Sequence, residues 1–331
     1  MAACREIPLL PFTSPEVVES ALNFRSPFDP SLPTLFIATY PKSGTHWCSS
    51  IVYHILLRSK KSCDADMPPL KHISNYAPFF DHPSTWSNKA LAPQYSETHE
   101  ELGRHVFRTH FLPPMLPLHG PDASRTKVIY VYRNAADVVT SLYHHLTNQI
   151  FHTPPSASTE TSSSSPSPKM NLTHPTPSFA EFVANFCNGS LIYGSWMEHI
   201  LDWFSTSLGE SILFLQYEDL LARPEENISK VAQFLGVDLS AEQLQYVVSQ
   251  TSFSTMSKDV DLYQPIGADW KPGFRFIRSG KKGDESLFGG EEASEARRRL
   301  DEFIQECIEK VKSRPFNDEA SRQRMLQLLS Q

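Results

Sequence analysis

The sequence lacks three features that would point to a membrane, a metal or a nucleic acid. No apolar run reaches the roughly 20 residues that a membrane-spanning helix needs. The net charge is -7, which leaves no general basic surface for a nucleic acid or an anionic membrane. The cysteines are scattered, without C-x-x-C or metal-ligand spacing, at Cys4, Cys48, Cys63, Cys187 and Cys307. Such usage suits a reducing compartment, so we expect a cytoplasmic protein without a signal peptide, metal, nucleic-acid partner or membrane partner.

The length and composition of the chain fit one domain. With 331 residues, 40% of them hydrophobic, the chain can bury a sizeable core, and nothing in it requires a second domain. Residues 1–33, rich in Pro and Phe, are expected to form an irregular arm over the core. Residues 153–178 are dominated by Ser, Thr and Pro, a composition that favours disorder. This insertion is either a lid over a site or filler.

Short apolar runs separated by amphipathic segments predict alternating strands and helices. Buried parallel strands appear as continuous apolar runs, whereas helices repeat their apolar residues every three or four positions. The predicted strands cover residues 35–38, 105–110, 127–132 and 211–216. The predicted helices follow the first strand and cover residues 134–147, 179–204 and 224–235.

The loop between the first strand and the first helix has the composition of an anion-binding site. It contains Lys42, Ser43, Gly44, Thr45 and His46. A helix N-terminus presents free backbone N–H groups and the positive end of its dipole, and the lysine adds a formal charge at the same point. The lysine precedes the glycine, and the loop is shorter than the G-x-x-x-x-G-K-[ST] loop of nucleoside triphosphatases. The loop therefore predicts an anion-binding site that differs from the loop of the nucleoside triphosphatases.

Two further strand ends carry polar residues. His110 leaves the second strand, and Arg133 follows the strand at 127–132, just before Asn134, a predicted helix N-cap. Chemistry in open α/β sheets is found at such strand ends. A lone histidine is more often structural than catalytic, and a salt bridge by itself explains an arginine here. A functional role for His110 and Arg133 is therefore indicated only by the sequence segments around them.

Several segments together resemble the cytosolic sulfotransferases, which use 3′-phosphoadenosine 5′-phosphosulfate (PAPS). Residues 40–47, Tyr-Pro-Lys-Ser-Gly-Thr-His-Trp, resemble the 5′-phosphosulfate loop of that family. Residues 128–141 resemble its 3′-phosphate segment, and residues 193–196 match its Tyr-Gly-Ser-Trp. Residues 251–256 resemble its adenine-side loop, and residues 274–284 resemble its basic loop around the 3′-phosphate.

The resemblance implies an α/β fold of the P-loop nucleotide-kinase-like sulfotransferase type, with a mainly parallel sheet flanked by helices on both faces. The implied reaction moves the sulfuryl group of PAPS to a hydroxyl or amine of a small-molecule acceptor, leaving PAP, without a metal. His110 would be the general base and Lys42 would stabilise the leaving nucleotide, with Arg108 in support. The implied PAPS-binding residues are Lys42, Ser43, Gly44, Thr45, His46, Trp47, Arg133, Ser141, Tyr193, Thr251, Ser252, Phe253, Met256, Phe276, Arg278, Ser279 and Gly280.

The chain departs from the family pattern at positions that bear on these roles. Arg108 and Ser279 each stand where the family has a lysine, and His46 replaces a threonine. An arginine can still pair with sulfuryl oxygens, but it never loses its proton. Lys281 or Lys282 would have to supply the contact that Ser279 lacks. The family's dimer motif is absent from residues 287–302, which leaves the oligomeric state open.

The acceptor pocket is expected to include Phe79, His82 and His145. The two histidines stand where many family members have phenylalanine, so the pocket would suit a small polar hydroxyl or amine compound. Two other functions remain open. One is a catalytically silent PAPS- or PAP-binding protein on the same fold, and the other, with less support, is a P-loop kinase.

Overall fold

The centre of the molecule is a four-stranded parallel sheet in the order β4-β1-β5-β7. Its strands are β1 (Thr34–Thr39), β4 (His105–Thr109), β5 (Thr126–Tyr132) and β7 (Ile212–Gln216). The four predicted strands are therefore confirmed. The computed structural model describes residues 15–24, 31–60, 71–82, 85–87, 90–92, 95–119, 123–150, 177–283, 287–289 and 291–330. All but the end of the predicted insertion at 153–178 lies outside the described residues.

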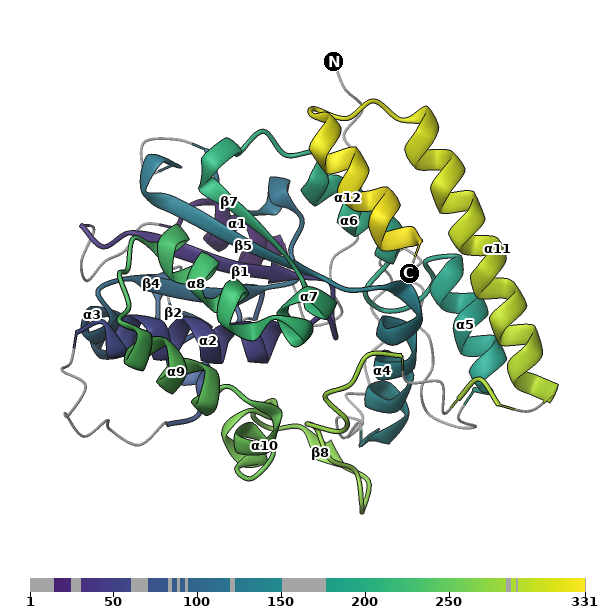
Figure 1. Ribbon diagram of the computed structural model, residues 1–331, viewed down its shortest axis with the longest axis horizontal. Helices are drawn as coiled ribbons and strands as arrows, with labels where there is room; N and C mark the ends of the chain where they lie inside the picture. Colours follow the sequence, from purple (N-terminus) through teal and green to yellow (C-terminus); the bar gives the residue numbers. More distant parts are fainter. Residues whose placement is uncertain are drawn as a thin grey trace, which may run out of the picture.

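Helices cover both faces of this sheet (Figure 1). One face packs against α2 (Thr45–Arg58), α8 (Pro224–Leu235) and α9 (Ala241–Gln250). The other face belongs to a core built with α1 (Pro15–Leu22), α4 (Ala135–Asn148), α5 (Phe179–Cys187), α6 (Trp196–Phe204), α11 (Glu291–Ser313) and α12 (Glu319–Leu329). The shorter elements are α3 (Ser96–Leu102), α7 (Tyr217–Ala222), α10 (Phe253–Met256), β2 (Trp86–Ser87), β3 (Ala90–Leu91), β6 (Gln149–Ile150) and β8 (Asp269–Trp270).

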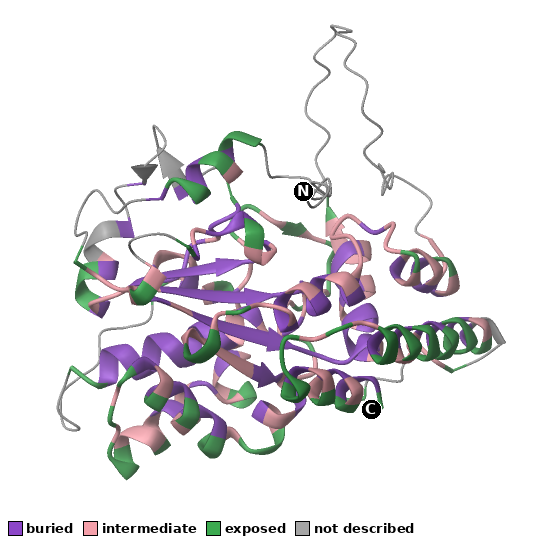
Figure 2. Cartoon of the chain, turned by 90° about the horizontal axis from the view of Figure 1, so that it is seen from above, coloured by how far each residue is buried: buried purple, intermediate pink, exposed green. Residues whose placement is uncertain are grey.

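Successive residues of each central strand face opposite layers of helices. In β1, Leu35 and Ile37 join the core on the α2 side, whereas Phe36 and Ala38 join the core on the other side. Figure 2 shows the central strands mostly buried, between helices whose outer surfaces are exposed. The main exception is the first part of β7, where residues 212–214 are half-buried. Because both faces are covered, both sets of alternating positions must be apolar, and this explains the continuous apolar runs in the sequence. Each fully buried large side chain contributes about 1.5–3 kcal/mol.

The strand order creates a crevice at one edge of the sheet. β1 lies between β4 and β5, so the chain leaves β1 for one neighbour and later returns to the other. Loops that leave adjacent strands in opposite directions open a crevice at their carboxyl ends, where open α/β sheets bind ligands. Lys42 follows β1, His110 follows β4, and Arg133 follows β5. The topology therefore brings these three residues to one edge.

The structure differs from the sequence-based prediction in two places. The arm at 1–33 contains the helix α1, which buries Val17 and Ala21 in the core. The predicted helix at 179–204 is two helices, α5 and α6, separated by Gly189 and Gly194. Both glycines have positive φ (73° and 69°), a conformation that side-chain-bearing residues rarely adopt. The apolar period continues across this break, which is why the sequence pattern indicated one helix.

A buried histidine pair predicts a loss of stability in acid. The Nδ1 atoms of His99 and His105 lie 3.2 Å apart, and Nε2 of His99 lies 3.2 Å from the carbonyl oxygen of Tyr76. Burial lowers the pKa of His99 to about 3, from about 6.5 in an unfolded chain. Because the folded pKa is the lower one, the stabilisation is present above about pH 6.5 and is lost progressively as pH falls towards 3, at up to about 1.4 kcal/mol per pH unit.

We expect His99→Asn to reduce this pH dependence. The measurement is the urea midpoint of unfolding for the variant and the wild type at several pH values between about 7 and about 5. His54 and His199, whose pKa values burial lowers to about 4 and about 3, titrate in both proteins, so the difference between the two proteins isolates the pair of His99 and His105. An unchanged slope in the variant would show that His99 does not cause the loss.

Candidate active site

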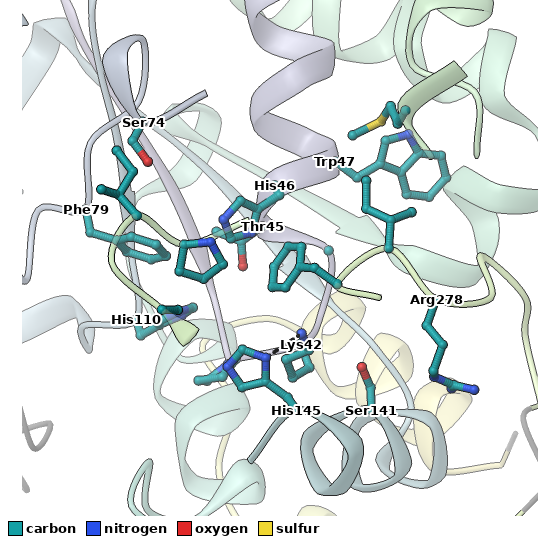
Figure 3. Close-up of a pocket in the computed structure, with 18 of the residues that line it drawn as sticks. Lys42, Thr45, His46, Trp47, Ser74, Phe79, His110, Ser141, His145 and Arg278 are labelled. Atoms are coloured by element: carbon teal, nitrogen blue, oxygen red, sulfur yellow. Dashed lines mark hydrogen bonds between the residues drawn. The ribbon is translucent and has the colours of Figure 1, made fainter. Parts of the chain in front are cut away.

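A single cavity of about 840 Å³ opens at the carboxyl edge of the sheet. Lys42, His110 and Arg133, the three residues expected to converge, all line it. Figure 3 shows Lys42 and His110 in this cavity. Other predicted residues that line it are Gly44, Thr45, His46, Trp47, Phe79, His82, Ser141, His145, Tyr193, Thr251, Phe253, Met256, Phe276, Arg278, Ser279 and Gly280. One molecule in this cavity can therefore reach residues that lie far apart in the sequence.

The loop from β1 to α2 is shaped to bind an anion. Lys42 has φ 69° and Gly44 has φ 108°, and these two left-handed residues turn the chain sharply into α2. A Cβ atom on Gly44 would lie 2.9 Å from the ring of Tyr217, so only glycine fits here. The first N–H groups of α2 have no acceptor within the helix. Ser43 Oγ and His46 Nε2 are also buried without a hydrogen-bond partner among the described residues.

Lys42 is held in the cavity without a carboxylate partner among the described residues. Its Nζ lies 3.3 Å from Nδ1 of His145 and 4.5 Å from the centre of the Phe276 ring. Burial, together with the positive charges of Arg133 and Arg278, lowers the pKa of Lys42 to about 7. Burial is the larger cause, and the smaller part that comes from Arg133 and Arg278 is repulsion between cations, which a bound anion relieves. This cluster of cations therefore favours a ligand with several negative charges.

His110 is fixed in one tautomer. Its Nδ1 lies 2.8 Å from the carbonyl oxygen of Thr39. A carbonyl only accepts, so Nδ1 carries the proton and Nε2 has the free lone pair. Burial, with smaller contributions from Arg108 and Lys42 and opposed by the Thr39 hydrogen bond, lowers the pKa of His110 to about 4. The neutral imidazole can therefore accept a proton at Nε2. The backbone N–H of His110 also donates to Asp81 at 2.9 Å.

Arg133 is anchored on both sides of the cavity. It pairs with Asp137 at 3.5 Å, donates to the carbonyl of Lys42 at 3.3 Å, and stacks over the Tyr217 ring at 4.2 Å. A further bond reaches the carbonyl of Lys281 at 3.4 Å. Its Nε atom is buried and has no partner among the described residues. Arg133 thus joins the β1 loop to the segment around residue 280 and keeps a donor available.

The far wall of the cavity has the flat, apolar character that an aromatic base requires. Trp47 packs against Tyr217 with ring centres 5.3 Å apart, and its Nε1 donates to the carbonyl of Thr251 at 2.8 Å. Gly280 has φ 58°, and a Cβ atom there would lie 2.2 Å from the ring of Phe253. The close approach of residues 253 and 280 closes this wall, and only a glycine allows it.

Histidines surround the opposite part of the cavity. His46 lies between Phe276 and Phe79, with ring centres 5.0 and 6.1 Å away. His145 packs on Trp270 at 5.0 Å. Burial, as the largest cause, lowers the pKa values of His46 and His145 well below the ordinary range, so both imidazoles are neutral at physiological pH. This part of the cavity is polar but carries no histidine charge.

The structure does not bring three of the predicted site residues to the cavity wall: Ser43, Arg108 and Ser252 are absent from its lining. Ser252 caps α10 by accepting from the N–H of Thr255. The Arg108 side chain turns towards Ala77 and Ser74, where its Nε and Nη2 donate at 2.6 and 2.7 Å. This structure thus shows no direct route from Arg108 to a sulfuryl group.

Sequence reasoning missed several lining residues. Tyr217 lies under Arg133, and Asp137 pairs with it while accepting from the N–H of Gly283 at 3.0 Å. The spacing of Arg133 and Asp137, four residues apart at a helix start, was the available signal for this pair. Ser74 and the segment 265–268 also line the cavity, and no local pattern indicated them.

The described ranges contain neither a cluster of metal-ligating side chains nor a membrane-spanning helix. No group of three or more His, Cys, Asp or Glu side chains there is arranged to hold a metal ion. No helix in those ranges is both long enough and apolar enough to cross a membrane. The three cysteines that the structure describes, Cys48, Cys187 and Cys307, are free thiols.

Comparison with known proteins identifies the family. The model of the sulfotransferase domain matches residues 32–313. Sulfotransferase 1A1 of Mus musculus is 32% identical over 254 residues, 76% of this chain and 75% of the relative. The 3-beta-hydroxysteroid sulfotransferase of Cavia porcellus is 29% identical over 250 residues, 74% of each chain. The chain belongs to the sulfotransferase family, and its class of reaction is sulfuryl transfer.

Solved structures show the same fold. Mouse sulfotransferase SULT7A1, crystallised with PAP, is similar with a TM-score of 0.60 and 22% identity over 96% of this chain and 94% of that one. Retinol dehydratase in complex with retinol and PAP gives a TM-score of 0.63 and 19% identity over 91% and 88% of the two chains. These likenesses confirm the predicted α/β fold with its mainly parallel sheet.

Proposed function

We propose that this sulfotransferase moves the sulfuryl group from PAPS to a hydroxyl or amine group of a small molecule, with His110 as the general base. The observation that carries the proposal is the convergence of Lys42, Arg133 and His110 on one cavity. The first two are cations suited to a nucleotide with phosphates at both ends, and the third is a neutral base. The PAP bound to the two solved structures supports the choice of donor.

The residues present fit PAPS. The α2 N-terminus, Lys42 and the unpartnered His46 Nε2 form an anion cradle for the 5′-phosphosulfate. On the other side of Lys42, Arg133 and Arg278 line the cavity beside Ser141 and would hold the 3′-phosphate. The wall of Trp47 and Phe253 would receive the adenine. When bound, PAPS supplies the activated sulfuryl group.

The protein's contribution to the reaction is positioning, charge stabilisation and proton transfer. His110 Nε2 would accept the proton of the acceptor group, while the Thr39 carbonyl keeps Nδ1 protonated and the ring oriented. The ammonium group of Lys42 would stabilise the charge that develops on the leaving nucleotide. Sulfuryl transfer resembles phosphoryl transfer, in which such positioning and electrostatic effects dominate catalysis.

The proposal is tested by incubating the purified protein with PAPS and a panel of phenols, alcohols and amines. A transferase releases PAP only when an accepted compound is present. If the protein binds PAP but forms no PAP from PAPS with any acceptor, it is instead a catalytically silent binding protein. In a parallel incubation with ATP in place of PAPS, acceptor-dependent release of ADP, with no turnover of PAPS, would support the kinase alternative.

The low pKa of Lys42 makes PAP binding at the donor site depend on pH. In the free protein that pKa is about 7, mainly through burial, and the charges of a bound anion raise it. Binding of PAP near pH 8 is therefore expected to take up as much as about one proton, and the affinity should weaken as pH rises above about 7. Calorimetry in buffers of different ionisation enthalpy measures the uptake.

Lys42→Arg provides the control for this proton uptake, since an arginine stays charged over the whole pH range of the measurement. The variant should bind PAP near pH 8 without the proton uptake. If the variant takes up as many protons as the wild type, Lys42 is not the titrating group.

A further inference from the structure

One wall of the cavity runs from His110 past Phe79 to Ser74. Figure 3 shows these three side chains following one another along the same side, away from Trp47 and Arg278. The Phe79 ring lies 5.1 Å from the ring of His110 and 4.3 Å from the guanidinium carbon of Arg108. Phe79 therefore separates the base from the buried cation by the width of about one aromatic ring.

Arg108 determines how Ser74 can hydrogen-bond. The guanidinium group donates through Nη2 to Ser74 Oγ at 2.7 Å. A guanidinium group only donates, so Ser74 uses a lone pair for Arg108 and keeps its own proton for another partner. Ser74 lines the cavity, and Arg108 lies behind it with a relative exposure of 1%. The cavity wall here therefore presents a hydroxyl donor polarised by a positive charge.

The segment that carries Ser74 is fixed by a second bond. The backbone N–H of Ser74 donates to Nδ1 of His72 at 3.1 Å, so the ring proton is on Nε2, which donates to the carbonyl of Gln264 at 2.8 Å. This chain of bonds ties Ser74 to the loop that continues into the cavity wall at residues 265–268. The hydroxyl is therefore held in place before any ligand arrives.

The positive charge at this end is not fully compensated. Arg108 Nη1 is buried and has no hydrogen-bond partner among the described residues. Burial lowers the pKa of Arg108 to about 9, against a smaller opposing effect of Asp81, so the guanidinium group is still charged at neutral pH. Burial also raises the pKa of Asp81 to about 7. Among the described residues lining the cavity, the one carboxylate is Asp137, which is bound to Arg133 and Gly283. An anion near Ser74 would thus meet a hydroxyl donor and a cation, and no carboxylate among the described residues lines that end of the cavity.

We propose that the end of the cavity at Ser74 is a subsite for an anionic group of the acceptor, and that the preferred acceptors are hydroxyaryl carboxylates. This inference rests on the proposed function, in which the reacting hydroxyl faces His110. The aromatic ring of the acceptor lies along Phe79 and carries its carboxylate to the Ser74 hydroxyl. Acceptors with an ammonium group at that position are rejected, because a second cation beside Arg108 is repelled.

The test compares three ligands that share one ring and one phenolic hydroxyl: para-hydroxyphenylacetate, tyrosol and tyramine. They present a carboxylate, a neutral alcohol and an ammonium group at the same end. Binding to the PAP-loaded protein is measured by calorimetry at neutral pH. The carboxylate is expected to bind about tenfold or more tightly than the amine, the scale of one charge-assisted hydrogen bond, with the alcohol between them.

Variants of Ser74 test whether the preference for the carboxylate ligand comes from the Ser74 hydroxyl. Ser74→Ala should remove most of the roughly tenfold preference for the carboxylate, and Ser74→Thr, which keeps the hydroxyl, should retain it. Ser74→Asp places a carboxylate against Arg108 and should reverse the order, so that tyramine binds most tightly. Ser313→Ala, an exposed serine on α11, is the matched control and should change nothing. Thermal unfolding of each variant shows whether it is folded.

The binding readout separates failure of this inference from failure of the proposed function. Acceptor-dependent PAP release, measured with the same three compounds, tests the reaction, whereas the binding order tests the subsite even if no turnover occurs. Binding of tyramine as tight as that of the carboxylate, no binding of any of the three, or a preference unchanged in Ser74→Ala and Ser74→Asp would each overturn the inference.

Discussion

Replacement of His110 by alanine is expected to lower the rate of sulfuryl transfer by about 10² to 10⁴-fold, the usual contribution of a positioned general base. The variant should still bind PAP with nearly unchanged affinity, because the anion cradle and Arg133 do not depend on the imidazole. The backbone N–H that donates to Asp81 is also retained. Single-turnover rates with PAPS and a phenolic acceptor, together with PAP calorimetry, provide the two measurements.

The matched control is His119→Ala, which removes an exposed imidazole away from the cavity lining. It should leave both the rate and the affinity for PAP unchanged. Turnover of His110→Ala near the wild-type rate would place the base elsewhere. A parallel loss of PAP binding would instead show that His110 acts through the structure of the site.

Replacement of Arg133 by alanine is expected to weaken binding of PAP by about 10- to 100-fold, the scale of a charge-assisted contact to a phosphate. Binding of AMP, which lacks the 3′-phosphate, should change far less. The reason is that Arg133 is proposed to contact that phosphate specifically. Calorimetry with the two nucleotides measures the difference, and Arg133→Lys, which keeps a charge without the planar fork, should give an intermediate loss.

Two features make the Arg133 comparison interpretable. Asp137 keeps partners in the variant, since it also accepts from Asn134 Nδ2 and from the N–H of Gly283. Arg223→Ala serves as the control, because Arg223 is exposed and pairs only with surface carboxylates in the described part of the chain. Equal losses of affinity for PAP and AMP would show that Arg133 supports the fold of the site and does not bind the 3′-phosphate.

The convergence of Lys42, His110 and Arg133 could be predicted from the sequence because it follows from local patterns. Each residue lies at, or within a few positions of, the end of a predicted strand, and parallel strands present their carboxyl ends at one edge. The helix start at Asn134 was predictable for the same reason, since its side chain accepts from the N–H of Asp137 only three residues later. Such features depend on neighbouring residues, so the sequence contains the information directly.

The orientation of Arg108 could not be predicted in the same way. Its position in β4 follows from the apolar period, but the side chain is held by Ser74 and Ala77, which belong to a segment more than thirty residues earlier. The backbone of that segment joins the edge of β4 through bonds between Pro78, Phe80 and Arg108. Nothing local to residue 108 indicates which way a buried guanidinium turns, because the choice depends on acceptors supplied from elsewhere.

The sequence by itself determined the order of strands and helices, the residues that leave each strand, and the loop that begins α2. These follow from short-range steric preferences and from the need to bury apolar residues on both faces of a sheet. Only the tertiary structure decided which side chains meet inside the cavity: Lys42 with His145, Arg133 with Tyr217, and Arg108 with Ser74. These pairs arise from packing between segments distant in the chain, where the direction of a side chain depends on the shape and hydrogen-bonding groups of its neighbours.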